Sequence, residues 1–197
     1  MARTQAADYD RRREAIREAA AGLYARHGFL GASIAQIAAA GATSKSLIYH
    51  YYPSKEDILF DVMNSHVQRL VEAAVAIERS ESSTEDKIRQ LANDLMQRYE
   101  GAQSNQKVLL NELSNLPDTR RQEIVDHQRT LLDVVDRLLL QLRPDLAKNR
   151  PRRRAIVMMF FGMLNWTHTW FDPHGSISSR EIASMAATMF LSGAAKA

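Results

Sequence analysis

Residues 44–50 carry side chains whose chemistry suits a polyanion. The order is Ser44, Lys45, Ser46, Leu47, Ile48, Tyr49 and His50. If this segment is a helix, Ile48 faces the interior and the polar side chains project outward. Hydroxyl, cationic and ring N–H groups of this kind hydrogen-bond to the base edges and phosphates of nucleic acids. We therefore predict DNA contacts from Ser44, Lys45, Ser46, Tyr49 and His50.

Residues on both sides of this segment could hold phosphates. Thr43 precedes the helix and offers a hydroxyl. Lys55 begins the next helix, where free backbone N–H groups also attract anions. Arg11–Arg13, in the N-terminal arm, could reach a flanking phosphate backbone or the minor groove, and each contact would add salt dependence. The alternative is that the whole region is only the core and surface of a small domain, in which Tyr51 and Tyr52 are core residues.

These groups need a helix-turn-helix to present them. Apolar residues at helical spacing predict a first helix from about Asp8 to His27, which Gly28 ends. Ser33 is the expected N-cap of a second helix over about 34–40, and residues 41–43 form the expected turn before the third. A trihelical unit of this kind places the second helix of the pair in the major groove. The pattern predicts a helix-turn-helix over about Ser33–Tyr52.

A second stretch, residues 158–171, suits an apolar ligand. Methionines and aromatic residues lie nearly all round this expected helix, which predicts burial on more than one side. Such side chains form adaptable apolar pockets, and Asn165, Thr167 and His168 add isolated polar groups. The predicted ligand site comprises Tyr99, Phe161, Asn165, Trp166, His168 and Trp170. The alternative is that the stretch forms only core and dimer interface.

Four arginines, at positions 150, 152, 153 and 154, lie directly before this stretch. Cations in the first turn of a helix oppose the helix dipole, so an anionic partner would be favourable there. We predict that Arg152 helps to bind the anionic end of the ligand. The alternative is a solvated helix start.

The remainder of the chain is also predicted to be helical. Gly and Pro are sparse, with eight and five residues, and no alternating β-branched runs indicate strands. We expect an all-α fold of about nine helices, with a DNA-binding domain over 1–54 and a ligand-binding and dimerisation domain over 55–197. The further helices are expected at about 55–78, 84–102, 106–115, 118–142, 152–171 and 178–194. The last helix has a small-residue face that could pack on a symmetry mate.

Composition sets broader limits. The 197 residues suffice for one or two small domains, and the absence of cysteine excludes disulfides and thiolate metal sites. Residues 1–55 hold eight basic and four acidic side chains, although the whole chain has a net charge of only +3. This asymmetry suits nucleic-acid binding, but a solvated charged surface also explains it. No apolar run could span a membrane and no secretory signal is present, so a cytoplasmic protein is expected.

Catalytic motifs are missing from the sequence. It has no Gly-rich phosphate loop, no GxSxG and no HExxH, and its six histidines form no i, i+4 pair. His168 could act as a general base, but no nucleophile or carboxylate partner is evident. We therefore expect neither an enzyme nor a metal or cofactor. A structural helical dimer without DNA binding is the alternative from another class.

The helix-turn-helix segment resembles the TetR family of bacterial repressors. The resemblance lies in Ile34–Ala38, in Gly41–Leu59 and in Ala25–Phe29 upstream. It implies a homodimer that binds a palindromic operator, with C-terminal helices that dimerise and enclose an inducer pocket. It also implies DNA contacts from Lys45, Tyr49, His50 and Lys55. The family usually has Ala-Gly where this chain has Gly41-Ala42, so Ala42 must adopt a conformation that favours glycine, or the turn must shift.

The C-terminal region is similar to one subgroup of that family. The residues concerned are Gly162–Thr167, Trp170-Phe171, Pro173, Gly175, Ile177-Ser178 and Glu181–Ala183. The subgroup responds to acyl-CoA thioesters, so the resemblance implies an acyl-CoA inducer. A drug-responsive regulator of an efflux pump is the alternative, because it too would use an aromatic, methionine-rich pocket.

Overall fold

The computed structural model describes the backbone of residues 2–194 and the side chains of residues 8–193. Within this part of the chain it contains nine α-helices and no strand, which confirms the all-α prediction. The chain forms two compact units. One comprises the residues up to 67 together with 104–125, and the other comprises 68–103 together with the residues from 126 onward. No helix in the described residues is long and apolar enough to cross a membrane.

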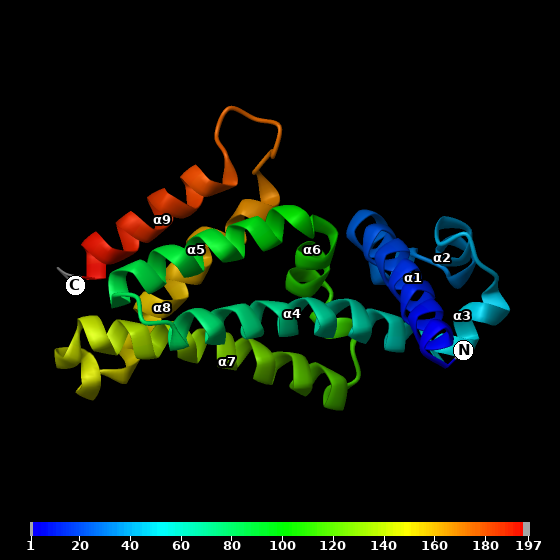
Figure 1. Cartoon of the computed structure of the whole chain (residues 1–197), viewed down its shortest axis with the longest axis horizontal. Coiled ribbons are helices and arrows are strands. Elements are labelled where there is room, and N and C mark those ends of the chain that lie inside the picture. Colours follow the sequence, from blue (N-terminus) through cyan, green and yellow to red (C-terminus); the bar gives the residue numbers. More distant parts are fainter. Residues whose placement is uncertain (1, 195–197) are drawn as a thin grey trace. The chain divides into compact units, whose positions relative to one another are not determined.

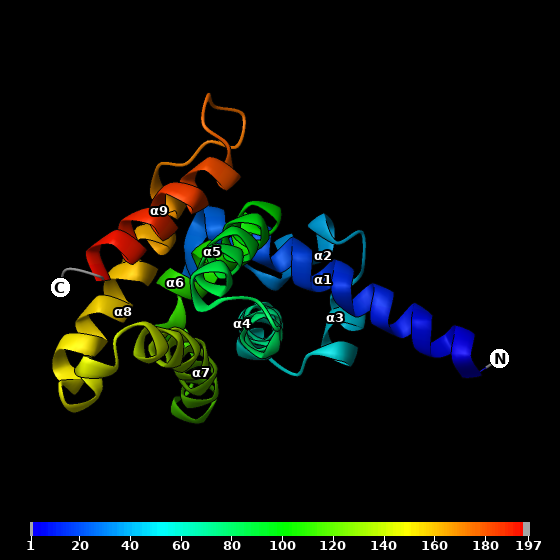
Figure 2. The ribbon, with the colours of Figure 1, turned by 60° about the vertical axis from the view of Figure 1, so that its left-hand side comes forward.

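The first unit contains the predicted helix-turn-helix (Figure 1). Its helices are α1 (Ala2–Gly31), α2 (Ile34–Ala40), α3 (Lys45–Tyr51), the first part of α4 (Lys55–Arg79), most of α6 (Gln103–Asn111) and the start of α7 (Asp118–Leu142). The long N-terminal part of α1 extends beyond α2 and α3 (Figure 2). Ile16 and Tyr24 of α1, Ile37 of α2 and Ile48 of α3 are all almost fully buried and form the small core.

Serine side chains fix where three of these helices begin. The Ser33 hydroxyl accepts a hydrogen bond from the Gln36 amide at 3.2 Å, while the Ser33 amide donates to the Gln36 side chain at 2.8 Å. This reciprocal capping box confirms Ser33 as the N-cap of α2. Ser44 caps α3 by accepting from the Leu47 amide at 3.1 Å. Ser54 does the same at the start of α4, accepting from the Asp57 amide at 3.1 Å.

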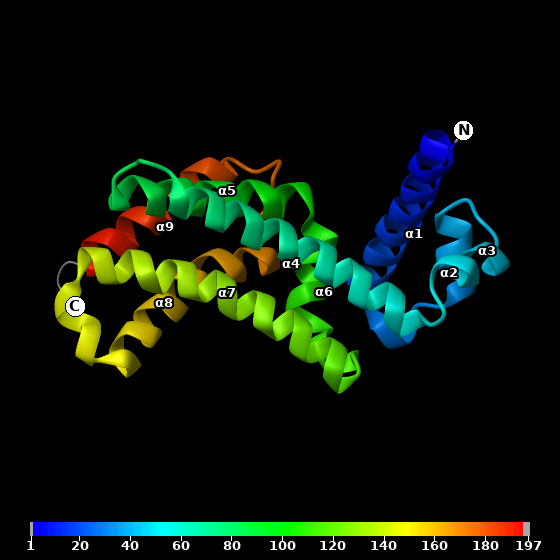
Figure 3. The same cartoon turned by 60° about the horizontal axis from the view of Figure 1, so that its bottom comes forward.

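The second unit is built around α5 (Thr84–Gly101), α8 (Arg150–Asn165) and α9 (Ser179–Ala194), which pack on one another (Figure 3). Leu91 and Leu95 of α5 and Val157 of α8 are fully buried in its core. The rings of Phe160 and Phe190 meet edge to face with centroids 4.9 Å apart. The remaining parts of α4 and α7 complete this unit.

The predicted helix over 152–171 is wrong at its C-terminal end. α8 ends at Asn165, and residues Trp166–Thr169 form a short 3₁₀ turn. Side chains there bond to nearby carbonyl groups: the Thr167 hydroxyl donates to Leu164 O at 2.5 Å, and the Thr169 hydroxyl donates to Trp166 O at 2.8 Å. Threonine side chains compete with helical bonding in this way. The predicted helix over 106–115 likewise lies at Gln103–Asn111, followed by a 3₁₀ turn at Leu113–Asn115.

The turn between α2 and α3 keeps its geometry despite its unusual sequence. Ala42 adopts a φ of 47°, the only positive value at a non-glycine residue in the described part of the chain, whereas Gly41 has a φ of −85°. The expectation that Ala42 takes the conformation normally given to glycine is confirmed. Left-handed backbone costs an alanine about 1–2 kcal/mol because its Cβ approaches the following carbonyl oxygen.

Replacing Ala42 by glycine should therefore stabilise the first unit. We expect Ala42→Gly to raise the free energy of unfolding by about 0.5–1 kcal/mol, after the greater entropy of unfolded glycine is subtracted. Urea denaturation followed by circular dichroism measures this change. The matched control is Ala39→Gly, an exposed position inside α2, which should lose about 1 kcal/mol. Equal destabilisation by both variants would contradict the strain at Ala42.

Candidate nucleic-acid interface

One face of α3 presents the predicted DNA-reading side chains to solvent. Lys45, Ser46, Tyr49 and His50 are all exposed, with Tyr49 exposed by 54%. They occupy positions i, i+1, i+4 and i+5, which share one side of a helix. Ile48, on the opposite side, is completely buried. The buried Ile48 side chain thus holds α3 against the core, and the polar face of the helix remains exposed.

The two residues that precede α3, Thr43 and Ser44, differ in whether their hydroxyl groups can reach a phosphate. The Ser44 hydroxyl oxygen accepts from the Leu47 amide, which leaves its O–H free to donate to a phosphate. The Thr43 hydroxyl oxygen is buried and has no hydrogen-bond partner among the described residues. A phosphate contact from Thr43 would therefore need a change of side-chain rotamer. Both DNA contacts remain predictions.

Lys55 is the first residue of α4, and its ammonium group reaches the C-terminal end of α1. Its ammonium donates to the carbonyl oxygens of Phe29 at 2.6 Å and Ala32 at 2.8 Å. The same nitrogen lies 4.1 Å from the centroid of the Phe29 ring. Carbonyl groups at a helix end lack helical partners and carry partial negative charge, so the cation is well placed there. An ammonium has three donors, and the predicted phosphate contact of Lys55 would use the third.

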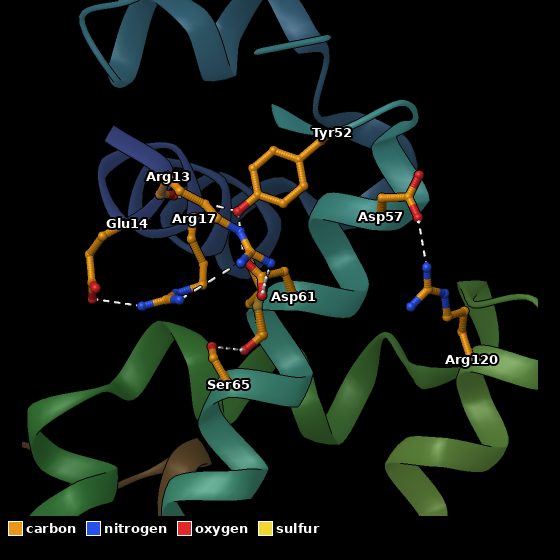
Figure 4. Close-up of polar contacts among 9 residues, drawn as sticks. Arg13, Glu14, Arg17, Tyr52, Asp57, Asp61, Ser65 and Arg120 are labelled. Atoms are coloured by element: carbon orange, nitrogen blue, oxygen red, sulfur yellow. Dashed lines mark hydrogen bonds and ion pairs between the residues drawn. The ribbon is translucent and has the colours of Figure 1, made fainter. Parts of the chain in front are cut away.

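A buried carboxylate, Asp61, fastens the residue that follows α3 to α1 (Figure 4). The Tyr52 hydroxyl donates to Asp61 Oδ2 at 2.5 Å, and Arg13 Nη2 donates to Asp61 Oδ1 at 2.9 Å. Arg17 Nη1 lies 3.9 Å from Oδ2 of the same carboxylate. Burial, followed by the hydrogen bond to Asp61, raises the pKa of Tyr52 above its ordinary value. This network joins α1, the exit of α3 and the first turns of α4.

Asp61 was not among the residues predicted from the sequence. The sequence feature that could have identified it is a single carboxylate inside the apolar run Ile58–Met63. A charge that is buried in such a run needs partners. The network also changes the interpretation of the N-terminal arginines. Arg13 is engaged by Asp61, whereas Arg11 and Arg12 pair with Asp8 on the surface.

Polar contacts also attach residues 104–125 to the helix-turn-helix within the first unit. The Phe29 amide donates to Glu112 Oε2 at 3.2 Å, beside Gly28, whose φ of 71° interrupts α1. Asn105 Nδ2 donates to Glu18 Oε2 at 3.3 Å. Further along, Arg120 donates to Asp57 at 3.3 Å and lies over the Phe60 ring. The orientation of α1 and α4 therefore depends on side chains from α6 and α7.

Three of the predicted ligand-site residues come together in the second unit. The Tyr99 hydroxyl on α5 donates to Asn165 Oδ1 on α8 at 2.9 Å. His168 is half-buried, and its Nδ1 lies 2.7 Å from the Asn165 carbonyl oxygen. Phe161 is buried and packs edge to face on Phe160. Tyr99, Asn165 and His168 thus form one polar cluster against an apolar interior.

Trp166 borders this cluster, with its ring centroid 6.3 Å from that of His168, whereas Arg152 lies apart from it. Trp166 and Trp170 are more than half exposed. Arg152 is exposed near the start of α8, 13 positions before Asn165, which corresponds to about 20 Å along a helix axis. Arg153, its neighbour, is held by Asp136 at 2.6 Å. Of the four arginines, Arg150, Arg152 and Arg154 are the exposed ones.

Family models cover both parts of the chain. The model for "Bacterial regulatory proteins, tetR family" matches residues 16–62, and the model for "Tetracyclin repressor-like, C-terminal domain" matches residues 81–194. The second match alone spans more than half of the chain. The chain belongs to the TetR family. Members of this family are transcriptional regulators rather than enzymes, and they bind operator DNA and small-molecule ligands, typically as dimers.

Solved structures of TetR-family proteins resemble the chain throughout. A TetR-family transcriptional regulator from Bordetella parapertussis 12822 shares 37% identity and a TM-score of 0.87, over 91% of this chain and 93% of that one. AibR, in complex with isovaleryl coenzyme A and operator DNA, shares 25% identity and a TM-score of 0.78, over 90% and 97%. The ketosteroid regulator KstR2 of Mycobacterium tuberculosis shares the fold at 18% identity, with a TM-score of 0.81 over 92% and 94%. No curated protein sequence matches this chain.

The buried Tyr52–Asp61 bond should make stability fall in alkali. A phenol whose pKa is raised on folding stabilises the protein below its unfolded pKa of about 10, and this contribution is lost as pH rises above that value. We expect the unfolding free energy of the wild type to fall more steeply than that of Tyr52→Phe between about pH 9 and 11. At pH 7 Tyr52→Phe should cost about 1.5–3 kcal/mol, because a buried carboxylate loses a donor.

Denaturation in urea across this pH range measures both effects. Tyr49→Phe is the control, since it removes a hydroxyl from an exposed ring of the same helix-turn-helix. Identical alkaline slopes for the wild type and Tyr52→Phe would contradict the assigned role of Tyr52.

Lys55 and Lys45 should differ in how much they contribute to the free energy of unfolding. Lys55→Met removes the ammonium that holds the Phe29 and Ala32 carbonyl groups, so we expect a loss of about 1–2 kcal/mol in unfolding free energy. Lys45→Met, at an exposed position with the same change in charge, should leave stability within about 0.5 kcal/mol. Chemical denaturation reports this difference, and equal stability of the two variants would refute the assigned role of Lys55.

Proposed function

We propose that this TetR-family protein is a ligand-responsive transcriptional repressor. It binds a palindromic operator as a homodimer and leaves the DNA when a small-molecule inducer, an acyl-CoA thioester, binds. Residues 1–54 read the DNA, and residues 55–197 bind the ligand and dimerise. The observation that carries the proposal is the exposed polar face of α3, backed by the buried Ile48 in a chain of this family.

The α3 face has the composition that base and phosphate recognition requires. Tyr49 and His50 offer ring donors and acceptors to base edges, and Lys45 offers a cation to guanine or phosphate. Ser44, Ser46 and Thr43 supply hydroxyls at the N-terminal end of the helix, and Lys55 supplies a phosphate anchor. None of the exposed side chains Lys45, Ser46, Tyr49 and His50 forms part of the buried core.

Exposed apolar side chains on α8 and α9 support a homodimer. Met159, Trp166 and Met189 are each exposed by more than 60%, and Met158 and Met185 by nearly half. Soluble proteins rarely leave such large apolar groups together in water. Met159 on α8 and Trp166 in the turn that follows it are seven residues apart, and Met185 and Met189 on α9 are four residues apart, so each pair lies on one stripe. A second copy that applies the same stripes would cover them with twofold symmetry.

The chemistry of the second unit supports an acyl-CoA inducer. The cluster of Tyr99, Asn165 and His168 can hydrogen-bond a thioester carbonyl, and buried Phe161 and its neighbours suit an acyl chain. Arg152, about 20 Å farther along α8, can attract phosphates of an elongated ligand. The AibR structure, which contains isovaleryl coenzyme A and operator DNA, provides a precedent at 25% identity. Trp166 and Trp170 complete the proposed site.

The inducer would release the protein from DNA by shifting the equilibrium between two arrangements of the dimer. A ligand shifts such an equilibrium only by binding one state better than the other. The two heads must match half-sites one helical turn apart, about 34–36 Å, to bind together. α4 and α7 each contribute residues to both compact units, so they are the elements we expect to carry the change.

Titration of DNA and ligand on the same protein tests this function. A fluorescent duplex from the protein's own promoter should bind in a salt-dependent manner, and isovaleryl-CoA or a longer acyl-CoA should release it. The same acyl-CoA at 100 times its Kd should stabilise the protein by about 2.7 kcal/mol in thermal denaturation. Tyr49→Ala should lose most DNA affinity and keep this stabilisation, whereas Asn165→Ala should do the reverse.

Four outcomes would overturn the proposal or part of it. Equal operator affinity with and without every acyl-CoA tested would remove the inducer assignment, and stabilisation by cationic dyes instead would indicate an efflux-pump regulator. Lack of salt-dependent binding to promoter DNA would favour a structural dimer. Turnover of the acyl-CoA would indicate an enzyme.

A further inference from the structure

A small charged group lies on the exposed surface of α1, outside the predicted reading face. Asp8 Oδ1 accepts from Arg11 at 2.7 Å, and Asp8 Oδ2 lies 2.8 Å from Arg12 Nε. The side chains of Arg11 and Arg12 are exposed by 80% and 53%. The hydrogen bond from Arg11 holds the pKa of the Asp8 carboxyl below its ordinary value, so the group stays ionised. One carboxylate therefore binds two surface guanidinium groups.

Neighbouring contacts show which side of α1 this group faces. Tyr9 packs on Tyr51, the last residue of α3, with ring centroids 4.6 Å apart. Ala19, seven residues after Arg12 and hence on nearly the same face, lies beside Gly41 in the turn before α3. Arg12 and Asp8 thus lie on the flank of α1 nearest to the helix-turn-helix.

Three other acidic residues of α1 lie on the side of the helix away from Arg12. Asp10, Glu14 and Glu18 follow one another at four-residue spacing. Glu14 pairs with Arg17 at 2.7 Å, and Glu18 accepts from Asn105 of α6. Asp8 and Arg12 therefore lie toward the helix-turn-helix, whereas Arg11, seven residues before Glu18, lies on the side of α1 that carries these acids.

We propose that Arg11 and Arg12 form a second DNA-contact surface, which binds phosphates that flank the operator half-site, and that Asp8 weakens this contact by competing with the phosphates. Arg13 takes no part, because Asp61 engages it. Exposed ion pairs have little net strength, so a duplex phosphate can displace the Asp8 carboxylate from both guanidinium groups. Asp8 then lowers affinity for DNA of any sequence, because phosphate contacts carry no sequence information.

This inference rests on the proposed DNA-binding function, and one titration series tests both. The full-length protein is titrated against two fluorescent duplexes, its own promoter fragment and a random sequence of equal length, from 50 to 300 mM NaCl. Asp8→Asn should raise the affinity for both duplexes by about 3- to 10-fold, since each half-site loses a repulsive charge. Arg11→Gln/Arg12→Gln should weaken both, and the log–log salt slope should fall by about 0.9 for each phosphate that the variant no longer binds.

A matched ion pair provides the control. Arg129 donates to Asp126 at 2.8 Å with the same i, i+3 spacing, and both side chains are more than half exposed on α7. Asp126→Asn makes the same change in net charge as Asp8→Asn, and Arg129→Gln removes one positive charge where the double variant removes two. Both control variants should leave both affinities within twofold. If the wild type binds DNA but the α1 variants match these controls, the inference is overturned and the proposed function stands. If the wild type binds neither duplex at 50 mM NaCl, the proposed function itself fails.

Discussion

The position of α3 depends on one buried carboxylate, that of Asp61. α3 has only seven residues and cannot be stable alone, so its orientation must come from its neighbours. Ile48 anchors its inner face, and Tyr52, the first residue after it, is tied to Asp61 of α4 and through Asp61 to Arg13 of α1. Buried ion pairs add little net stability, but the loss of one partner leaves an uncompensated charge. The network therefore acts chiefly to select one arrangement of three helices.

Other polar contacts extend this constraint to α6 and α7. Just after Gly28, the Lys55 ammonium binds the carbonyl oxygens of Phe29 and Ala32, and the Glu112 carboxylate accepts from the Phe29 amide. The cation thus meets the negative ends of backbone dipoles and the anion meets a positive end. Hydrogen bonds are directional, whereas apolar packing tolerates small shifts. The helix-turn-helix and residues 104–125 are therefore joined by directional contacts within one compact unit.

Local signals in the sequence predicted part of this structure well. The helix start at Ser33 and the span of α7 follow from capping and periodicity, which act over a few residues. The left-handed Ala42 is one of the two alternatives that the family resemblance left open. Features that depend on distant partners were not predictable in this way. The ends of α6 and α8, the Tyr52–Asp61 bond and the internal use of Lys55 all require knowledge of what packs nearby. Arg13 and Arg153 look like their basic neighbours in sequence, yet each binds a carboxylate on another helix.

The stretch 158–171 illustrates why one pattern gave two interpretations. A helix that is apolar all round must be covered on every side, and the monomer covers only one: Phe160, Phe161 and Leu164 are buried, while Met159 and Trp166 are exposed. The same segment thus has an inward face for a core or ligand and an outward face for a second protomer. In such an arrangement Asn165, beside Trp166, lies where the two faces meet. A ligand that contacts Tyr99 and Asn165 would then bear directly on the packing between protomers, and α4 and α7, which contribute residues to both compact units, would carry the change to the helix-turn-helix.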